Sequence, residues 1–185
     1  WSEPPDLDGL IGASEIILGY GVEMELANDF IPAEPVITHV TWWGAYFETE
    51  SPCEPGITTP GFNLRIWTDV GCKPETLVAD LSITDFTEEL IHCRGWTPIY
   101  RYGADVVVEV LPGNRYWFCA QLKGHYFPPR WGRLESLPIL GCESQWRSEY
   151  FGVPDWIGAC SDIFEACDFS QEFTGDHPEA CCFTD

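Results

Sequence analysis

Basic side chains are scarce in this sequence. Nine lysines and arginines stand against thirty aspartates and glutamates, which gives a formal net charge of −21. The basic residues are scattered, with no run of three. Nucleic acids are bound by clustered lysines and arginines, so this composition excludes a simple nucleic-acid interface. The acidic excess favours solubility and leaves carboxylates available for cations.

Long apolar runs and catalytic motifs are also missing. No stretch approaches the ~18 apolar residues of a membrane-spanning helix, so we expect no membrane span. There is no G-x-S-x-G, H-E-x-x-H or glycine-rich phosphate loop. The four histidines are isolated, and His39 is expected to be a hydrogen-bonded structural group. A pair of carboxylates suited to a glycosidase is guaranteed among thirty acids and so indicates nothing. We expect a protein that is not an enzyme.

Cysteine, by contrast, is plentiful. There is no C-x-x-C pair and no cysteine–histidine array with zinc spacing, so disulfides in an oxidising exterior explain the count best. An odd number leaves one thiol free or bonded to another subunit. The disulfide candidates are Cys53, Cys72, Cys93, Cys119, Cys142, Cys160, Cys167, Cys181 and Cys182.

The start of the sequence suggests export. The chain begins at Trp1 and its one methionine is Met24, as expected of a mature chain after removal of a signal peptide. We therefore expect an extracellular or cell-surface protein. The first thirteen residues hold two prolines and two glycines and predict an extended arm.

The stretch Val36–Phe47 is the strongest strand signal. It reads V-I-T-H-V-T-W-W-G-A-Y-F, uncharged and rich in β-branched and aromatic residues. Apolar side chains fall on both alternating faces, with Val40 and Trp42 on one and Trp43 on the other. A strand that is apolar on both sides is covered on both sides, which predicts the interior of a sandwich.

A second alternating stretch precedes it. The even positions from 16 to 26 are apolar or aromatic, and the odd ones include two glycines and two glutamates, which predicts one half-buried strand. We interpret it either as an ordinary strand of the sandwich or as a strand donated to a neighbouring subunit. The residues that would form this assembly strand are Ile16, Leu18, Tyr20, Val22, Met24 and Leu26.

Further short strands follow, separated by proline- and glycine-rich turns. Phe62–Thr68 alternates between Phe62, Leu64 and Ile66 on one side and Asn63, Arg65 and Trp67 on the other. Residues 84–96 predict a helical turn or an irregular excursion. Tyr100–Leu111 and Arg115–Leu122 flank a Pro-Gly-Asn turn and predict a β-hairpin. We also expect strands over Leu77–Ile83 and Asp168–Thr174, and a short one within Trp146–Trp156.

These elements define the predicted fold. Many short strands with almost no helix indicate an all-β protein, a disulfide-rich antiparallel β-sandwich of jelly-roll type with an N-terminal extended arm or strand. The expected organisation is an arm over 1–13, a sandwich domain over 14–175 and a cysteine-containing tail over 176–185.

Several of these stretches together resemble a family of exported bacterial domains of unknown function. The opening W-S-E-P-P-D-L, then E-L-A-N-D-F, then P-V-I-T-H-V-T-W-W-G-A-Y are similar to that family's W-S-Q-P-P-D-L, L-A-D-D-F and P-I-T-D-I-H-W-W-G-S-Y. F-N-L-R-I-W-T-D-V, L-P-G-N-R-Y-W-F, P-P-R-W-G-R and D-F-S-Q-E-F-T-G extend the similarity to roughly residues 1–175. The resemblance implies a jelly-roll-like sandwich on secreted or surface-displayed proteins and implies no activity. The Ile16–Leu26 alternation and the cysteine load depart from the family pattern.

Two kinds of ligand site are candidates. Carbohydrate is the first, because five tryptophans supply enough rings for a stacking platform; these are Trp42, Trp43, Trp67, Trp117 and Trp131. Trp131, beside two prolines in an expected loop, is the preferred stacking residue. Calcium is the second, at Asp6 and Asp8, at Asn28 and Asp29, or at Asp69, although no D-x-D-x-D-G loop fixes their geometry.

Two functional hypotheses follow from the sequence. The leading one is a secreted, non-enzymatic structural subunit of a filament, sheath or surface layer, whose copies join by β-strand addition of the N-terminal segment. The alternative is a secreted carbohydrate-binding module that uses loop tryptophans.

Overall fold

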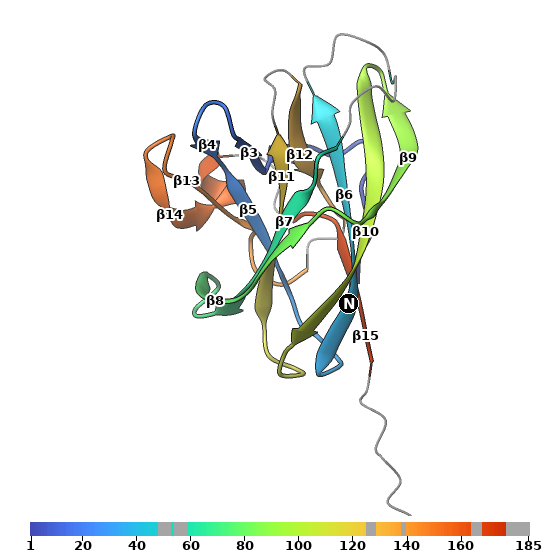
Figure 1. Ribbon diagram of the computed structural model, residues 1–185. Helices are drawn as coiled ribbons and strands as arrows, with labels where there is room; N and C mark the ends of the chain where they lie inside the picture. Colours follow the sequence, from blue (N-terminus) through green and yellow to red (C-terminus); the bar gives the residue numbers. More distant parts are fainter. Residues whose placement is uncertain (48–52, 54–58, 125–128, 138–139, 164–167, 177–185) are drawn as a thin grey trace, which may run out of the picture.

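The computed structural model is a β-sandwich of two packed sheets (Figure 1). It describes residues 1–47, 53, 59–124, 129–137, 140–163 and 168–176. The seven-stranded sheet contains β1 (Ser2–Glu3), β2 (Ile11–Ala13), β6 (Val36–Phe47), β9 (Thr87–Arg94), β10 (Thr97–Glu109), β12 (Arg130–Leu134) and β15 (Gln171–Asp176).

The eight-stranded sheet forms the other layer. It contains β3 (Glu15–Ile17), β4 (Val22–Glu23), β5 (Glu25–Phe30), β7 (Phe62–Asp69), β8 (Pro74–Ile83), β11 (Tyr116–Gly124), β13 (Gln145–Ser148) and β14 (Val153–Gly158). Strand β3 runs parallel to β11, and the other pairings between described strands are antiparallel. A short helical turn, η1 (Ala159–Ile163), follows β14. The predicted all-β sandwich is therefore confirmed.

Strand β6 has the predicted boundaries and is covered on both faces. Trp42 and Tyr46 point between the sheets, whereas Trp43 and Ala45 pack with Leu134 on the outer side. One local detail differs from strict alternation. The register shifts between His39 and Ile37, so Ile37 lies on the same inner face as Val40 and Trp42.

The core between the sheets is largely aromatic. The Trp42 and Tyr102 rings stack with centroids 5.6 Å apart, and Phe62 meets both edge-on at 5.0 and 4.9 Å. Trp131 closes this cluster, donating from Nε1 to the Tyr102 hydroxyl over 3.3 Å. Such tilted and offset arrangements are those that aromatic rings prefer in protein cores.

The N-terminal segment packs onto the sandwich of its own chain. Strand β1 pairs with β15, and β2 pairs with β12. Leu7 and Ile11 pack over the outer face of β6, beside Trp43 and Leu134. The expected arm is therefore hydrogen-bonded to the seven-stranded sheet and packs on its outer face.

The predicted single strand over Ile16–Leu26 is wrong. The chain reverses after β3, so that Ile17 pairs with Val22 in a hairpin. Gly21 adopts a φ of +64°, which glycine tolerates because it lacks a Cβ. Leu18 and Tyr20 lie in the exposed turn.

The second half of that stretch returns to the core. Val22, Met24 and Leu26 are buried with Trp146 and Phe169 of the same chain, while Ile16 is half-buried. Burial alternates as predicted over Val22–Met24, but in β3 the order is reversed, with Ile17 buried and Ile16 half-buried. Alternation in the sequence alone does not reveal the turn between the two strands.

Two further local predictions are corrected. Strands β10 and β11 do not form a hairpin, because β10 pairs with β6 and β9 while β11 pairs with β5, β7 and β3. The Pro-Gly-Asn turn thus carries the chain from one sheet to the other. Most of the predicted irregular excursion over 84–96 is strand β9, which is stabilised by pairing to β10.

Disulfides fasten the periphery. Cys53 bonds to Cys93, and Cys72 bonds to Cys142, closing loops of 40 and 70 residues. Cys160 is also disulfide-bonded. Cys119 is a free thiol, fully buried in β11, and cannot reach another subunit. The remaining candidates, Cys167, Cys181 and Cys182, lie outside the described residues.

No helix in the described part of the chain is long and apolar enough to cross a membrane.

A buried arginine joins the two sheets. Arg133 of β12 is completely buried, and its Nη1 donates to the carbonyls of Leu26 and Phe118, at 3.4 and 3.0 Å, in the eight-stranded sheet. Its Nη2 donates over 3.2 and 3.1 Å to the Ser170 carbonyl and to Gln171 Oε1 at the start of β15. Burial lowers the pKa of Arg133 to about 10, but the group stays charged at neutral pH.

Two buried carboxyls, those of Glu3 and Asp168, lie near this arginine, and a third buried carboxyl, that of Asp29, is paired with Arg115. Burial raises the pKa of Glu3 to about 7, of Asp29 to about 6 and of Asp168 to about 8. Glu3 Oε2 accepts hydrogen bonds from Asn28 and Gln171, both at 2.8 Å, and so ties β1 to each sheet.

We predict that Arg133→Met lowers the free energy of unfolding by about 3–5 kcal/mol, because it leaves buried carbonyls and Glu3 without their cationic partner. Arg101→Met is the matched control, since Arg101 is paired to Glu89 at 2.9 Å with both side chains more than half exposed. That pair should contribute less than about 1 kcal/mol. Urea unfolding with the disulfides intact measures both. Equal losses in the two variants would contradict a central role for Arg133.

We predict that stability falls as the pH rises from about 4 to about 8. Unfolded carboxyls titrate near pH 4, whereas Glu3, Asp29 and Asp168 titrate at about 7, 6 and 8 in the fold. The folded state therefore holds more protons across this window, and each rising pH unit costs stability. Urea midpoints measured along the pH series should decline, and Glu3→Gln should flatten the decline. A midpoint that rises towards pH 8 would refute this.

Candidate functional site

A hollow of about 380 Å³ opens on the outer face of the eight-stranded sheet. Its volume lies at the lower end of the range of about 300–1,000 Å³ that is typical of small-molecule sites. We call it the outer hollow; it is lined by Gly21, Glu23, Glu25, Arg65, Trp67, Leu77, Asp80, Arg147, Ser148, Glu149, Tyr150 and Pro154.

The alternation of side chains along the strands decides which residues form the floor of the outer hollow. In β7 the inner side chains Leu64 and Ile66 enter the core, which turns Arg65 and Trp67 to the opposite face. Asp80 stands on the neighbouring edge strand β8, where it pairs with Arg65 in the ladder. Glu25 begins β5 and pairs with Arg147 of β13. Adjacent strands thus bring side chains from distant parts of the sequence together.

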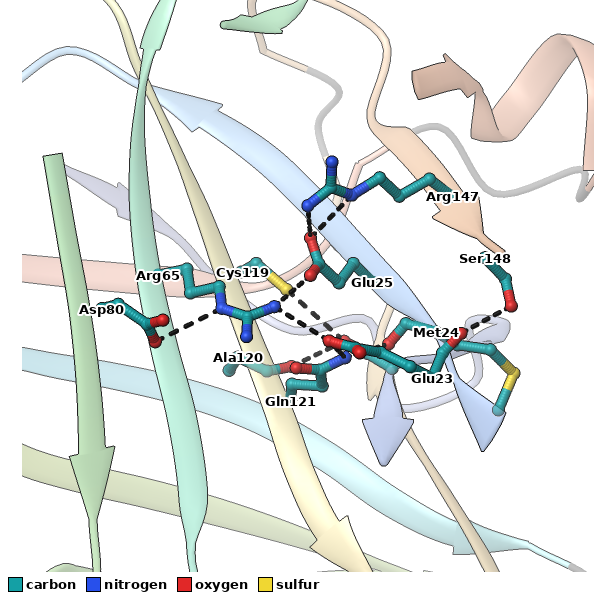
Figure 2. A network of polar contacts seen from close by, with 11 residues as sticks. Glu23, Met24, Glu25, Arg65, Asp80, Cys119, Ala120, Gln121, Arg147 and Ser148 are labelled. Carbon is teal, nitrogen blue, oxygen red and sulfur yellow. Dashed lines mark hydrogen bonds and ion pairs between the residues drawn. The ribbon is translucent and has the colours of Figure 1, made fainter. Parts of the chain in front are cut away.

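The floor is a continuous ion-pair network (Figure 2). Arg65 Nη1 donates to Glu25 Oε1 and, over 3.0 Å, to Glu23 Oε1, while its Nε donates to Asp80 over 3.3 Å. On the other side of Glu25, Oε2 accepts from Nε and Nη2 of Arg147 at 2.9 and 2.8 Å. Glu25 therefore lies between two guanidinium groups, and both of its oxygens are engaged.

Burial determines the electrostatics of this network. The Glu25 side chain is only 4% exposed, and burial raises its pKa against the opposing attraction of Arg65 and Arg147. The Arg65 pKa lies above its ordinary value, because the attraction of Glu25 and its acidic neighbours exceeds the effect of burial. The two pairs that Glu25 makes with Arg65 and Arg147 are accordingly shielded from salt.

Arg147 is further fixed by two indole rings. Its guanidinium carbon lies 4.9 Å from the Trp67 ring centroid and 4.4 Å from that of Trp156. The two rings meet edge-on at 5.9 Å. Cation–π contacts of this kind add to the ion pair and help to hold the guanidinium group in place.

The wall of the outer hollow comes from two hairpin turns. The β3–β4 turn contributes Gly21, and the β13–β14 turn contributes Glu149 and Tyr150. Tyr150 is 59% exposed and meets the Phe151 ring edge-on at 5.0 Å. Both turns project from the same end of the eight-stranded sheet (Figure 1). The arrangement combines an exposed aromatic ring with fixed, planar hydrogen-bonding groups.

Of the five candidate tryptophans, Trp67 lines the outer hollow. Trp42, Trp117 and Trp131 have no exposed surface and Trp43 is 8% exposed. The preference for Trp131 is therefore corrected: it lies in β12, not in a loop, and its ring fills the core beside Phe62 and Tyr102.

The candidate calcium ligands have other partners. Asp29 accepts from the Cys142 amide and pairs with Arg115 at 3.0 Å, and Asp69 accepts from Trp117 Nε1 at 2.8 Å. Asn28 donates to Glu3, and Asp6 accepts from the Asp8 amide. No group of three or more acids, histidines or cysteines in the described ranges is arranged to hold a metal ion.

A second hollow, of about 360 Å³, lies beside His39, between the β8–β9 connection and β10. Asp105 meets His39 Nδ1 at 2.7 Å, which agrees with the hydrogen-bonded role expected of this histidine. Asp105 is 95% exposed, so the pair is open to water and only weakly stabilising.

Sequence reasoning missed most of the outer hollow. Glu25 is one acid among thirty, and Arg147 and Tyr150 fall in a stretch for which the sequence predicts only a short strand. The available signal was the polar side of β7, where Arg65 and Trp67 alternate with core residues.

Together, the fold and the outer hollow define a disulfide-bonded β-sandwich with an open surface site on one sheet. A family model described as a domain of unknown function, DUF7901, matches residues 1–97, just over half of the chain. The chain belongs to this family. The matched part includes Glu25, Arg65 and Asp80, whereas Arg147 and Tyr150 lie beyond it. No curated protein and no solved structure matches the chain.

Proposed function

We propose that this chain is an exported, non-enzymatic module that binds carbohydrate in the outer hollow. The main support for this proposal is that the outer hollow combines an exposed aromatic ring, Tyr150, with a floor of paired guanidinium and carboxylate groups. Sugars present apolar C–H faces to aromatic rings and hydroxyl groups to planar charged side chains, so both halves of the hollow match their chemistry. The proposal keeps the carbohydrate hypothesis but replaces the buried Trp131 with the outer hollow of the eight-stranded sheet as the binding site.

The engagement of the floor supports binding rather than catalysis. A general acid or base needs an oxygen free to exchange a proton with the substrate. Glu25, the buried acid of the floor, lacks such an oxygen, because both of its oxygens already accept from arginines. Export is supported by the disulfides Cys53–Cys93 and Cys72–Cys142, which persist in oxidising surroundings.

We predict that Tyr150→Ala weakens carbohydrate binding by about tenfold or more, equal to about 1.4 kcal/mol, because it removes the exposed ring. Binding partners are first found on a glycan array, and affinities are then measured by isothermal titration calorimetry. Tyr150 lies in an exposed turn, so circular dichroism should show an unchanged fold.

Trp96→Ala is the matched control. Trp96 is also 59% exposed, but it lies in the β9–β10 turn, on the other sheet and outside the lining of the outer hollow. Its loss should leave affinity unchanged. An array without binding, or a Trp96→Ala effect as large as that of Tyr150→Ala, would refute the proposal.

An extracellular structural subunit is the second candidate function, favoured by an open sheet edge. Strand β8 is hydrogen-bonded to β7 on one side and to no other described strand. Leu77 and Val78 on it are 41% and 39% exposed. Edges of this kind are templates for strand addition. Copies would then join at β8, since Val22, Met24 and Leu26 are buried in their own domain.

If copies assemble at β8, Val78→Lys should return assembled species to the 20.9 kDa monomer, because a charge at the edge opposes pairing. Leu111→Lys is the control, since Leu111 is 65% exposed but lies in the connection between β10 and β11, outside any strand. Sedimentation velocity measures both. A wild-type protein that stays monomeric at all concentrations would exclude this candidate.

A further inference from the structure

The charges of the outer hollow are unequally exposed. Four carboxyl groups line it, those of Glu23, Glu25, Asp80 and Glu149, against two guanidinium groups. The Glu23 and Asp80 side chains are 48% and 47% exposed. The Arg65 and Arg147 side chains are 17% and 28% exposed. Negative charge thus faces the solvent, and positive charge lies beneath it.

The two arginines are also occupied. Arg65 donates to three carboxylates, and Arg147 is paired with Glu25 and covered by the rings of Trp67 and Trp156. An incoming anion would need to break these contacts and would meet uncompensated carboxylates. Sulfated sugars and uronic acids are therefore poor ligands for this hollow.

At the rim, Glu149 and Tyr150 are adjacent and exposed. A carboxylate beside an aromatic face is a favourable setting for an ammonium group, which is attracted by the charge and by the ring quadrupole. The formal charge of −21 on the whole chain acts in the same direction and raises the local concentration of cations.

We propose that the ligand of the outer hollow is an amino sugar with free, protonated amino groups, such as a chain of glucosamine units. This inference rests on the proposed carbohydrate function and specifies its substrate class. The sugar ring packs on Tyr150, its ammonium groups face Glu149 and the exposed carboxylates of Glu23 and Asp80, and its hydroxyl groups meet the floor.

The test compares glucosamine oligomers with fully N-acetylated oligomers of the same length. Titration calorimetry is performed at a mildly acidic pH, at which the amines are protonated, and at low and high salt. The glucosamine oligomer should bind at least about tenfold more tightly, and added salt should reduce this preference because it screens the exposed charges. An oligogalacturonate of similar length, an anionic ligand, should bind more weakly than either.

A charge-matched pair of variants localises the effect. Glu149→Gln should weaken binding of the glucosamine oligomer by about fivefold, the effect expected of one exposed charge at contact. Glu109→Gln makes the same change at an exposed position of β10, on the other sheet, and should leave binding unchanged. Both positions are exposed, so both variants should fold.

The outcomes separate the two proposals. If no carbohydrate binds, the proposed function fails and this inference fails with it. If the N-acetylated or the anionic oligomer binds as tightly as the glucosamine oligomer, carbohydrate binding stands and the amino-sugar assignment is overturned. Equal losses in Glu149→Gln and Glu109→Gln would assign the preference to overall charge and would likewise overturn it.

Discussion

The buried guanidinium of Arg133 is the interaction on which the rest of the structure depends. It donates to carbonyl groups of β5 and β11 in one sheet and to that of Ser170, next to β15 of the other sheet, so one side chain links the two layers. Around it, Glu3, Asn28 and Gln171 fix the first and last described strands to the same point. Desolvating a charge is costly unless hydrogen bonds compensate it. A packing of the two sheets that removed these hydrogen bonds would leave the buried charge uncompensated and is therefore disfavoured.

Whether a feature of the fold could be predicted from the sequence depends on how far apart in the sequence the interacting residues lie. Val36–Phe47 and the alternation of Phe62–Thr68 report local burial, and both emerge from the sequence with nearly correct boundaries. Two predictions are wrong: the single strand over Ile16–Leu26, and the hairpin formed by Tyr100–Leu111 and Arg115–Leu122. Both depend on which strands pair, and strand pairing is decided by the tertiary structure. Apolar alternation is the same whether a strand continues, reverses at Gly21 or crosses to the other sheet.

The outer hollow was less predictable for a similar reason. Its floor joins Glu25, Arg65 and Arg147, residues up to 122 positions apart, and no motif marks them. Trp131 appeared accessible because it follows two prolines, yet its ring completes the core beside Tyr102. Composition identified the kind of residue that a sugar site needs, whereas the topology of the sheet decided which tryptophan reaches the surface.

The two sides of the outer hollow differ in their relation to the family. The floor strands β5, β7 and β8 lie within the matched region, whereas β13, which carries Arg147, and the hairpin turn with Glu149 and Tyr150 lie beyond it. A turn of this kind tolerates substitution and insertion, since few buried contacts depend on its tip. Ligand preference can therefore diverge among relatives by changes confined to one short turn, while the scaffold that positions it stays the same.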